Sequence, residues 1–332
     1  MSPDTSFLVV VVVLALAFAY TNGFHDAPTS IATAISTRAL TPRVAVVMAA
    51  SMNVIGAFLG EGVARTIGRH IISAPQGNQG LAVLAAALVG AVAWNVLTWY
   101  KGMPSSASHA LVGGMLGAAL ASATTVDWPG VARTFALPML LAPVVGYVLG
   151  FLLMLSMLWA FRNRGPQVLS RKFKVAQCVS ASAMALGNGL QDAQKTMGVI
   201  VLALIATGSQ DNYDVPTWAV ILAAIAMSLG TASGGWRIMR TLGRRVIQMG
   251  PSRGFAAEAT VAAITYATSF IWNVPMSSTH TVTSAIVGVG AAERLRAVRW
   301  GMAGNIVVVW LFTLPGAAMV AAISYWMLWP LL

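Results

Sequence analysis

The stretch YTNGFHDAPTSIATAISTRAL (Tyr20–Leu40) puts polar and ionisable side chains where a long apolar run should be most apolar. The run from Thr5 to Phe24 contains no Asp, Glu, Lys or Arg, and a membrane-spanning helix needs roughly 20 mostly apolar residues. Asp26 follows inside the same apolar segment, where a charged group costs about 2.5–3.5 kcal/mol on insertion scales. Because some interaction must offset that cost, the stretch predicts a polar site within a membrane-embedded helix.

The composition of the whole chain is that of a membrane protein. Hydrophobic residues make up 58% of the 332 positions and charged residues only 9%, against about 25% in soluble domains. Further stretches without a charged residue are Ile71–Tyr100, Thr134–Phe161, Val215–Trp236, Ala259–Ala292 and Trp300–Leu332. We therefore predict an all-α, polytopic integral membrane protein that is in contact with lipid.

The net charge of +11 has a membrane explanation as well. In a soluble protein this charge would suggest a nucleic-acid partner. Here the basic residues stand in short loops between apolar runs, which is the positive-inside pattern, so no nucleic-acid partner is expected. The single Cys178 excludes an internal disulfide and a cysteine metal cluster.

Two motifs occur twice, in the same order and about 170 residues apart. NGFHDAPTS (Asn22–Ser30) returns as NGLQDAQKT (Asn188–Thr196), and WNVLTWYKGMPSSASH (Trp94–His109) returns, shortened, as WNVPMSSTH (Trp272–His280). Two repeats in register indicate an internal duplication. We expect a first transmembrane repeat over residues 1–160, a cytoplasmic linker over 161–173 and a second repeat over 174–332.

Each half contains five apolar segments, so the second half should run opposite to the first. This inverted arrangement is common in secondary transporters, which bind substrate near the midplane between the repeats. The segments are 6–38, 43–62, 79–100, 103–123 and 130–160, then 174–207, 216–236, 254–273, 275–291 and 299–327. Segments 103–123 and 275–291 are short and begin at a proline, so they either span the membrane or re-enter it.

Most basic residues then fall on one side of the membrane, which should be the cytoplasm. Both termini would lie on the other side, together with the two dissenting residues Arg65 and Arg69. The cytoplasmic set is Arg38, Arg43, Lys101, Arg162, Arg164, Arg171, Lys172, Lys174, Arg237, Arg240, Arg244, Arg245, Arg253, Arg294, Arg296 and Arg299.

The first repeated motif predicts a cation or proton site. Gly23, Gly189 and Pro28 should weaken the helices there, and a broken membrane helix frees carbonyl groups that can hold cations. The alternative is a carboxylate that snorkels to a nearby interface. The candidate cation-coupling residues are Asn22, Asp26, Thr29, Asn188 and Asp192.

The second repeated motif predicts a site for a small oxyanion. Each copy places a proline at a helix start and follows it with hydroxyl residues, and first-turn hydroxyl and N–H groups converge on an oxyanion. Ordinary N-capping would account for one serine per copy but not for three hydroxyls. The candidate anion-binding residues are Ser105, Ser106, Ser108, Ser277, Ser278 and Thr279.

Other polar residues in apolar segments are further candidates. The histidines could orient hydroxyls or relay protons. Lys195 could pair with Asp192, touch the anion or face a cytoplasmic cavity, and each glutamate is either an interfacial residue or a functional one. These further candidates are His25, His109, Gln191, Lys195, His280, Asn95, Asn273, Glu61 and Glu258.

With these motifs the chain resembles the inorganic phosphate transporter (PiT) family over nearly its whole length. The similar stretches are NGFHDAPTSIATAISTRALTP, WNVLTWYKGMPSSASHALVGG, GNGLQDAQKTMGVI, GGWRIMRTLGRRVIQM, GFAAEAT and NVPMSSTHTVTSAIVG. The resemblance implies inverted repeats, inward phosphate transport with a cation, and a homodimer. Bacterial members with the His-Asp form of the first motif are generally proton-coupled and can take phosphate as a neutral divalent-metal complex, whereas archaeal and animal members use sodium. The family usually has Ala-Asn where this chain has Pro28-Thr29, and Asn at the place of Gln191.

We therefore expect a secondary active phosphate symporter of a bacterial inner membrane, not an enzyme. It would have no cofactor and no permanent metal site, and it would carry phosphate with a proton, with sodium, or as a metal complex. Sulfate transport is an alternative because sulfate is also tetrahedral. An ion channel would need a continuous polar stripe, and a membrane phosphatase would need a nucleophile with a base or a metal cluster, none of which is evident.

Overall fold

The structure is a computed structural model that describes residues 3–73, 75–163 and 166–331. In these ranges every regular element is helical except for one isolated β-bridge between Ile72 and Val126. The first half contains α1 (Pro3–Ser36), α2 (Pro42–Ala57), α3 (Gly62–Arg69), α4 (Asn78–Lys101), α5 (Ala107–Ala121), α6 (Trp128–Val131), the π-helical turn η1 (Ala132–Ala136) and α7 (Leu137–Ala160). These helices match the first five expected apolar segments to within a few residues.

The second half matches its five expected segments equally well. It contains α8 (Pro166–Ala206), α9 (Thr217–Ser233), α10 (Trp236–Arg240), η2 (Thr241–Arg245), α11 (Pro251–Ala267), η3 (Thr268–Trp272), α12 (Ser278–Glu293), η4 (Leu295–Ala297), α13 (Trp300–Leu328) and η5 (Trp329–Leu331). The main difference is at the expected linker 161–173. Helix α8 already begins at Pro166, so most of that linker is helical, while Arg164 and Gly165 lie outside the described residues.

Long apolar helices confirm that the chain is an integral membrane protein. Among the described residues, four helices are long and apolar enough to cross a membrane, or six if two bent pairs each count as one span. The bends are 68° between α2 and α3 and 56° between α9 and α10. The 15 residues of α5 extend for about 22 Å at 1.5 Å per residue, which is shorter than a hydrocarbon core of about 30 Å. Helix α5 therefore does not cross the membrane by itself.

Helices α1 and α8 run unbroken through the repeated Asn-Gly motif, so the expected helix break at this place is wrong. The glycines instead allow close helix crossings. A Cβ atom at Gly23 would lie 2.1 Å from the carbonyl oxygen of Met227 in α9. A Cβ atom at Gly189 would lie 2.3 Å from the carbonyl oxygen of Asn53 in α2. Pro28 also lies inside the continuous helix α1. The hydroxyl of the next residue, Thr29, donates a hydrogen bond to the carbonyl oxygen of Asp26 at 2.7 Å.

The opposing helices also use glycine at these two crossings. A Cβ atom at Gly56 of α2 would lie 2.1 Å from the carbonyl oxygen of Leu186, and one at Gly230 of α9 would lie 2.0 Å from that of Tyr20. Tyr20 and Leu186 occupy the same place in the duplication, two residues before the motif asparagine. Each motif helix is thus fixed at close range against a helix of the other half.

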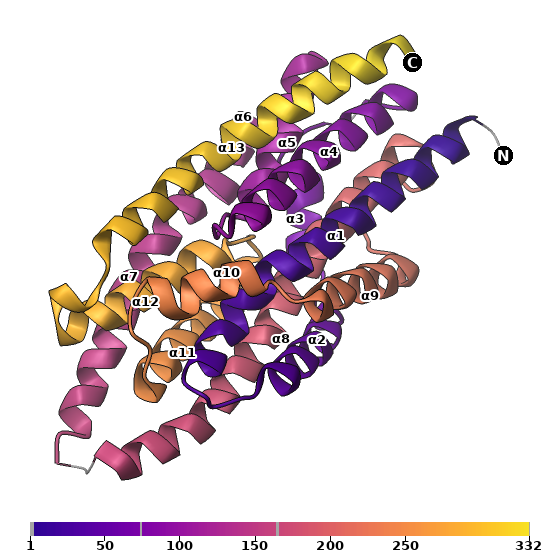
Figure 1. The fold of residues 1–332 in the computed structure, drawn as a ribbon. Coiled ribbons are helices and arrows are strands. Elements are labelled where there is room, and N and C mark those ends of the chain that lie inside the picture. The colour runs from indigo at the N-terminus through magenta and orange to yellow at the C-terminus, as the bar shows by residue number, and fades with distance from the viewer. Residues whose placement is uncertain (1–2, 74, 164–165, 332) are drawn as a thin grey trace.

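The short helices α5 and α12 are also held by the opposite half. Helix α5 packs along α13, where Gly117 faces the carbonyl oxygen of Ala318, and α12 packs along α7, where Gly288 faces that of Tyr147. Figure 1 shows α13 running along the side of the bundle beside α4 and α5. The two halves are therefore interleaved, and both hydroxyl-rich helix starts are positioned by contacts between the halves.

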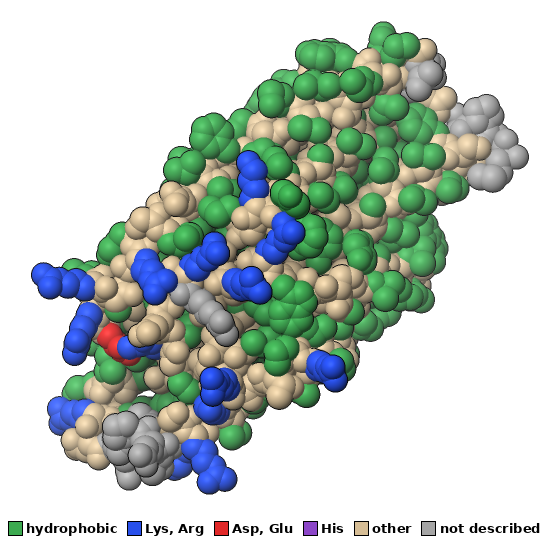
Figure 2. Space-filling view, viewed as in Figure 1, with side chains coloured by type: hydrophobic (Ala, Val, Ile, Leu, Met, Phe, Trp, Pro, Cys, Tyr) green, Lys and Arg blue, Asp and Glu red, His purple; other side chains and the backbone are tan. Residues whose placement is uncertain are grey.

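The Lys and Arg side chains visible on one face gather away from the end at which both chain ends lie (Figure 1 and Figure 2). Figure 1 shows both labelled chain ends together at one end of the bundle. Figure 2 shows Lys and Arg gathered toward the other end, while green apolar side chains cover much of the face between. The dissenting Arg65 pairs with Asp214 at 3.0 Å, and Arg69 lies 5.0 Å from the ring centre of Tyr213. The charge of Arg65 is thus paired with a carboxylate, and that of Arg69 has a cation–π contact with an aromatic ring.

We predict that Gly189→Ala destabilises the protein, because the added methyl group would meet backbone atoms of α2 and overpacking of this kind costs about 1–3 kcal/mol. Gly304→Ala in α13 is the matched control, since a Cβ atom there has nothing within 4 Å. The measurement is the thermal unfolding midpoint of both variants in detergent. An unchanged midpoint for Gly189→Ala would show that the crossing is looser than described.

Candidate functional site

The two hydroxyl motifs begin two helices in the same way. Ser106 caps α5 by accepting a hydrogen bond from the backbone N–H of His109 at 3.2 Å, and Ser277 caps α12 by accepting from that of His280 at 3.2 Å. All six candidate anion-binding side chains are at most 5% exposed. N-capping accounts for one serine per motif, as expected, and the remaining hydroxyls make different contacts.

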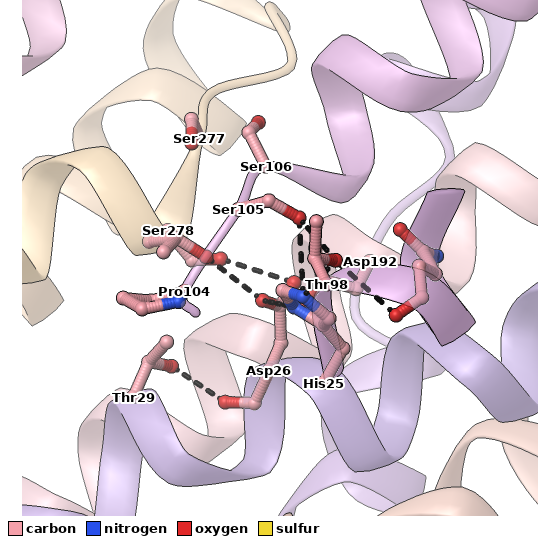
Figure 3. A network of polar contacts seen from close by, with 12 residues as sticks. His25, Asp26, Thr29, Thr98, Pro104, Ser105, Ser106, Asp192, Ser277 and Ser278 are labelled. Atoms are coloured by element: carbon pink, nitrogen blue, oxygen red, sulfur yellow. Dashed lines mark hydrogen bonds and ion pairs between the residues drawn. The ribbon is translucent and has the colours of Figure 1, made fainter. Parts of the chain in front are cut away.

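Two of those hydroxyls bind the carboxylate of Asp26. Ser278 donates to Oδ2 of Asp26 at 3.2 Å, and Thr279 donates to Oδ1 at 3.0 Å. Nδ1 of His25 lies 3.5 Å from the same Oδ1. Figure 3 shows His25, Asp26, Ser105 and Ser278 directed toward one another. A carboxylate of the first half is therefore in direct contact with the hydroxyl motif of the second half.

His25 and Gln191 occupy equivalent positions in the two motif copies and have equivalent contacts. Nε2 of His25 lies 3.1 Å from the hydroxyl of Ser105, just before α5. Nε2 of Gln191 donates to the carbonyl oxygen of Val274 at 3.3 Å, and its Oε1 accepts from the backbone N–H of Met276 at 3.2 Å. Each side chain thus holds the loop that leads into the hydroxyl motif of its own half.

Further hydrogen bonds connect the two halves at the same place. The hydroxyl of Ser108 donates to the carbonyl oxygen of Met276 at 3.0 Å. Nδ2 of Asn188 donates to the hydroxyl of Thr29 at 2.9 Å. The hydroxyl and carboxylate motifs of both halves therefore form one polar cluster.

The two motif histidines pack against each other. The rings of His109 and His280 have centroids 4.4 Å apart, and His280 also lies 4.0 Å from the ring of Trp310. Nδ1 of His109 lies 2.7 Å from the hydroxyl of Ser106, whereas neither ring nitrogen of His280 has a hydrogen-bond partner among the described residues. This geometry fits orientation of the Ser106 hydroxyl better than a proton relay through His280.

The second motif carboxylate has a cationic partner. Nζ of Lys195 lies 2.5 Å from Oδ1 of Asp192, and the two side chains are 1% and 0% exposed. Of the three placements that the sequence left open for Lys195, the structure therefore shows the pair with Asp192.

Several buried polar atoms of the cluster lack a hydrogen-bond partner in the described part of the chain. They are both polar atoms of the Asn22 side chain, Oδ1 of Asn188 and Oδ2 of Asp192. An unsatisfied buried polar atom costs about 1–3 kcal/mol, so these atoms are suited to an exchangeable ligand. Within the described ranges no group of three or more His, Cys, Asp or Glu residues could hold a metal ion. Oxygen atoms dominate the cluster, which suits a proton or a hard cation.

Asn273 and Glu61 lie apart from this cluster, whereas Asn95 lies at its edge, where its backbone carbonyl oxygen accepts from the Thr98 hydroxyl at 3.2 Å. Asn273 is exposed at the end of η3 in a left-handed conformation with φ 52°, so the structure does not bring it into the buried cluster. Glu61 is 39% exposed and pairs with Arg65 at 3.2 Å, as an interfacial residue would. Asn95 is buried, and its Nδ2 lies 3.4 Å from the hydroxyl of Thr21 between α1 and α4.

Glu258 is fully buried in a second polar cluster. Its carboxylate accepts hydrogen bonds from the hydroxyl of Ser180 at 2.5 Å, from Nε2 of Gln177 at 3.1 Å and from the hydroxyl of Thr33. Sequence reasoning did not identify these three partners. Their spacing is a weak signal, since Gln177 and Ser180 stand three residues apart on one face of α8.

Thr98 is a further site residue that sequence reasoning did not identify. Its hydroxyl lies 2.9 Å from that of Ser105 and 3.2 Å from Nε2 of His25, so it completes the support of the loop before α5. It stands between the two parts of the second motif that are repeated, in a stretch that the second copy lacks, so the duplication gave no signal for it.

Helix starts that meet between two repeats deep in the membrane commonly form the binding sites of secondary transporters. A family model described as the phosphate transporter family matches residues 22–321. The chain belongs to this family, so it is a transporter and not an enzyme, and the resemblance seen in its motifs is confirmed.

Relatives and a solved structure agree with this assignment. A probable low-affinity inorganic phosphate transporter of Rhizobium meliloti (strain 1021) is 46% identical over 326 residues, which cover 96% of this chain and 95% of the relative. One of Bacillus subtilis (strain 168) is 40% identical over 323 residues, with 96% of each chain covered. A solved structure described as the sodium-dependent phosphate transporter has a TM-score of 0.87 and 25% identity, and the match covers 98% of this chain and 100% of that one.

We predict that His25→Gln retains most transport, because Gln191 performs the same task in the other half, whereas His25→Ala lowers uptake about tenfold or more by releasing the loop at Ser105. Initial uptake of labelled phosphate, normalised to membrane-inserted protein, would be measured for both variants. Equal loss in both would contradict a purely positioning role.

Proposed function

We propose that this protein imports inorganic phosphate across the inner membrane of a bacterium by symport with a cation, and that the cation is a proton. The observation that carries this proposal is the contact of the Ser278 and Thr279 hydroxyls with the carboxylate of Asp26. Through this contact the candidate cation ligand, Asp26, is hydrogen-bonded directly to two candidate phosphate ligands, Ser278 and Thr279.

Phosphate and cation binding are coupled because each hydroxyl has only one proton to donate. A hydroxyl has one proton to donate, and an ionised carboxylate only accepts. When phosphate takes the hydroxyl protons of Ser278 and Thr279, Asp26 loses two donors at a site that is 2% exposed. A proton or cation on Asp26 then offsets that loss, so phosphate and cation each raise the affinity of the other.

The helix starts provide the remaining phosphate ligands. Helices α5 and α12 both begin inside the bundle, and N–H groups at a helix start attract anions. The hydroxyls of Ser105, Ser106, Ser108 and Ser277 stand at these two starts and would complete the shell around a tetrahedral anion.

Alternating access by two inverted repeats fits this site. Support comes from the paired motifs, from the equivalent glycine crossings and from the opposite courses of α1 and α8 in Figure 1. The gathering of Lys and Arg at one end in Figure 2 supports placing that end in the cytoplasm. Movement of one group of helices against another, each group drawn from both repeats because the halves are interleaved, would open the buried cluster to either side.

Sodium coupling is the second candidate, and it is favoured by the similarity to a solved sodium-dependent phosphate transporter. Thr29, Asn22 and the carboxylate of Asp26 offer the oxygen ligands that sodium would need. Proteoliposomes with either an inward sodium gradient or an inward proton gradient separate the two candidates, because only the coupling ion drives phosphate accumulation.

We predict that the wild-type chain restores labelled phosphate uptake to a strain without other phosphate permeases and that Asp26→Asn lowers uptake to the background. Asp127→Asn is the matched control, because Asp127 is 39% exposed and asparagine caps a helix as well as aspartate does. Unlabelled sulfate should not compete. Full activity of Asp26→Asn, or no uptake by the wild type, would refute the proposal.

We further predict that Thr279→Val weakens phosphate binding by roughly 10- to 150-fold, which corresponds to a hydrogen bond to a charged group worth about 1.5–3 kcal/mol. Thr283→Val is a close control, since Thr283 lies one turn later in α12, is also buried, and its hydroxyl has no hydrogen-bond partner among the described residues. Calorimetric titration of purified protein gives both affinities. Equal affinities would remove Thr279 from the phosphate site.

A further inference from the structure

The two copies of the carboxylate motif are neutralised in different ways. Within the described residues, the side chains that donate hydrogen bonds to the Asp26 carboxylate are the hydroxyls of Ser278 and Thr279, with Nδ1 of His25 3.5 Å away. Asp192 receives the ammonium group of Lys195 at 2.5 Å. The duplicated carboxylates therefore have the same place in the sequence and different electrostatic surroundings.

The difference comes from one pair of equivalent positions. Thr29 and Lys195 each stand three residues after the motif aspartate. The Thr29 hydroxyl donates to the carbonyl oxygen of Asp26 and accepts from Asn188, so this position contributes oxygen in the first half. In the second half the same position contributes a positive charge.

The ammonium group of Lys195 is a permanent part of the site. The side chain is 1% exposed, and Asp192 is its one ion-pair partner within 4 Å in the described ranges. Separation of such a buried pair would leave an uncompensated charge, which is strongly unfavourable. At 2.5 Å from a carboxylate oxygen, the ammonium nitrogen lies where a bound cation would contact Asp192.

The same lysine also lies near both hydroxyl motifs. Its side chain lines a small void of about 10 Å³ together with Ser108 of the first motif, Pro275 at the start of the second and otherwise apolar side chains. Because the buried charge of Lys195 is little screened, it would offset the charge of a phosphate held by these motifs in the way that a co-transported cation would.

We propose, on the basis of the phosphate–cation symport above, that Lys195 is a tethered cation that fills the second-half cation site. One exchangeable cation, at Asp26, then accompanies each phosphate, although the duplication provides two aspartates. Lys195→Thr reproduces the first-half residue and creates a second exchangeable site at Asp192.

Equilibrium phosphate binding to purified protein tests this stoichiometry. The apparent affinity is titrated against pH in choline chloride, and against sodium chloride at constant pH. The slope is that of the logarithm of phosphate affinity against the logarithm of proton or sodium concentration. It is about one for each cation taken up with phosphate, so the sum of the two slopes gives the number of cations of either kind. Phosphate also changes its own protonation with pH, but this contribution is the same for every variant, so it drops out of the difference between two variants.

The expected result is that the summed slope of Lys195→Thr exceeds that of the wild type by about one. Its phosphate affinity should be low at low cation concentration and recover as the concentration rises. Lys195→Arg, which keeps the charge, should have the wild-type slope. An unchanged slope for Lys195→Thr, with affinity reduced equally at every cation concentration, would make Lys195 a simple phosphate ligand and overturn the proposal.

A double variant keeps the proposal testable if Lys195→Thr does not fold. Asp192→Asn combined with Lys195→Met removes both charges of the pair, and the wild-type slope should persist because Asp26 remains. A slope lower by about one would show that Asp192 exchanges a cation in the wild type, against the proposal. Failure of the symport itself has a different signature, namely no phosphate binding by the wild type or a cation dependence that survives Asp26→Asn.

Discussion

A hydroxyl group has one proton, and it cannot donate that proton to a carboxylate and to a phosphate at the same time. This constraint governs the centre of the molecule, where Ser278 and Thr279 donate to the buried carboxylate of Asp26. Phosphate and Asp26 compete for the same donors, and a cation resolves the competition by neutralising the carboxylate. Coupling then needs no distant communication, since both ligands act on the same two side chains.

The fold places these groups together by interleaving the two halves. Asp26 comes from α1 in the first half, whereas Ser278 and Thr279 come from the start of α12 in the second. Glycine crossings fix α1 against α9 and α8 against α2. Asp26 lies on α1, which packs against α9, whereas Ser278 and Thr279 begin α12, which packs against α7. A shift of α1 and α9 against α7 and α12 would therefore change the geometry at Asp26.

Much of this arrangement could be predicted from the sequence. Charge-free and mostly apolar runs located ten segments that correspond to helices, and the duplication identified residues that the structure brings into one buried cluster. Such features are local or repeated, so a single sequence displays them. The membrane cost of Asp26 and Asp192 was the strongest signal, because no apolar helix retains a carboxylate without a partner.

What the sequence did not predict depends on contacts between helices. Gly23 and Gly189 suggested helix breaks but serve close packing, since the same residue suits both purposes. Asn273 shares the repeated Trp-Asn pair with Asn95 yet ends a helix at the surface. Thr98 and the partners of Glu258 depend on how helices face one another, and sequence spacing does not determine that.

The most direct test of the account is an experimental structure of the protein with phosphate bound. We predict that the hydroxyl oxygens of Ser278 and Thr279 lie about 2.7 Å from phosphate oxygens, as in O–H···O hydrogen bonds, and that Asp26 carries a proton or a coordinated cation. Phosphate bound elsewhere, with both hydroxyls still on an ionised Asp26, would contradict the shared-donor mechanism.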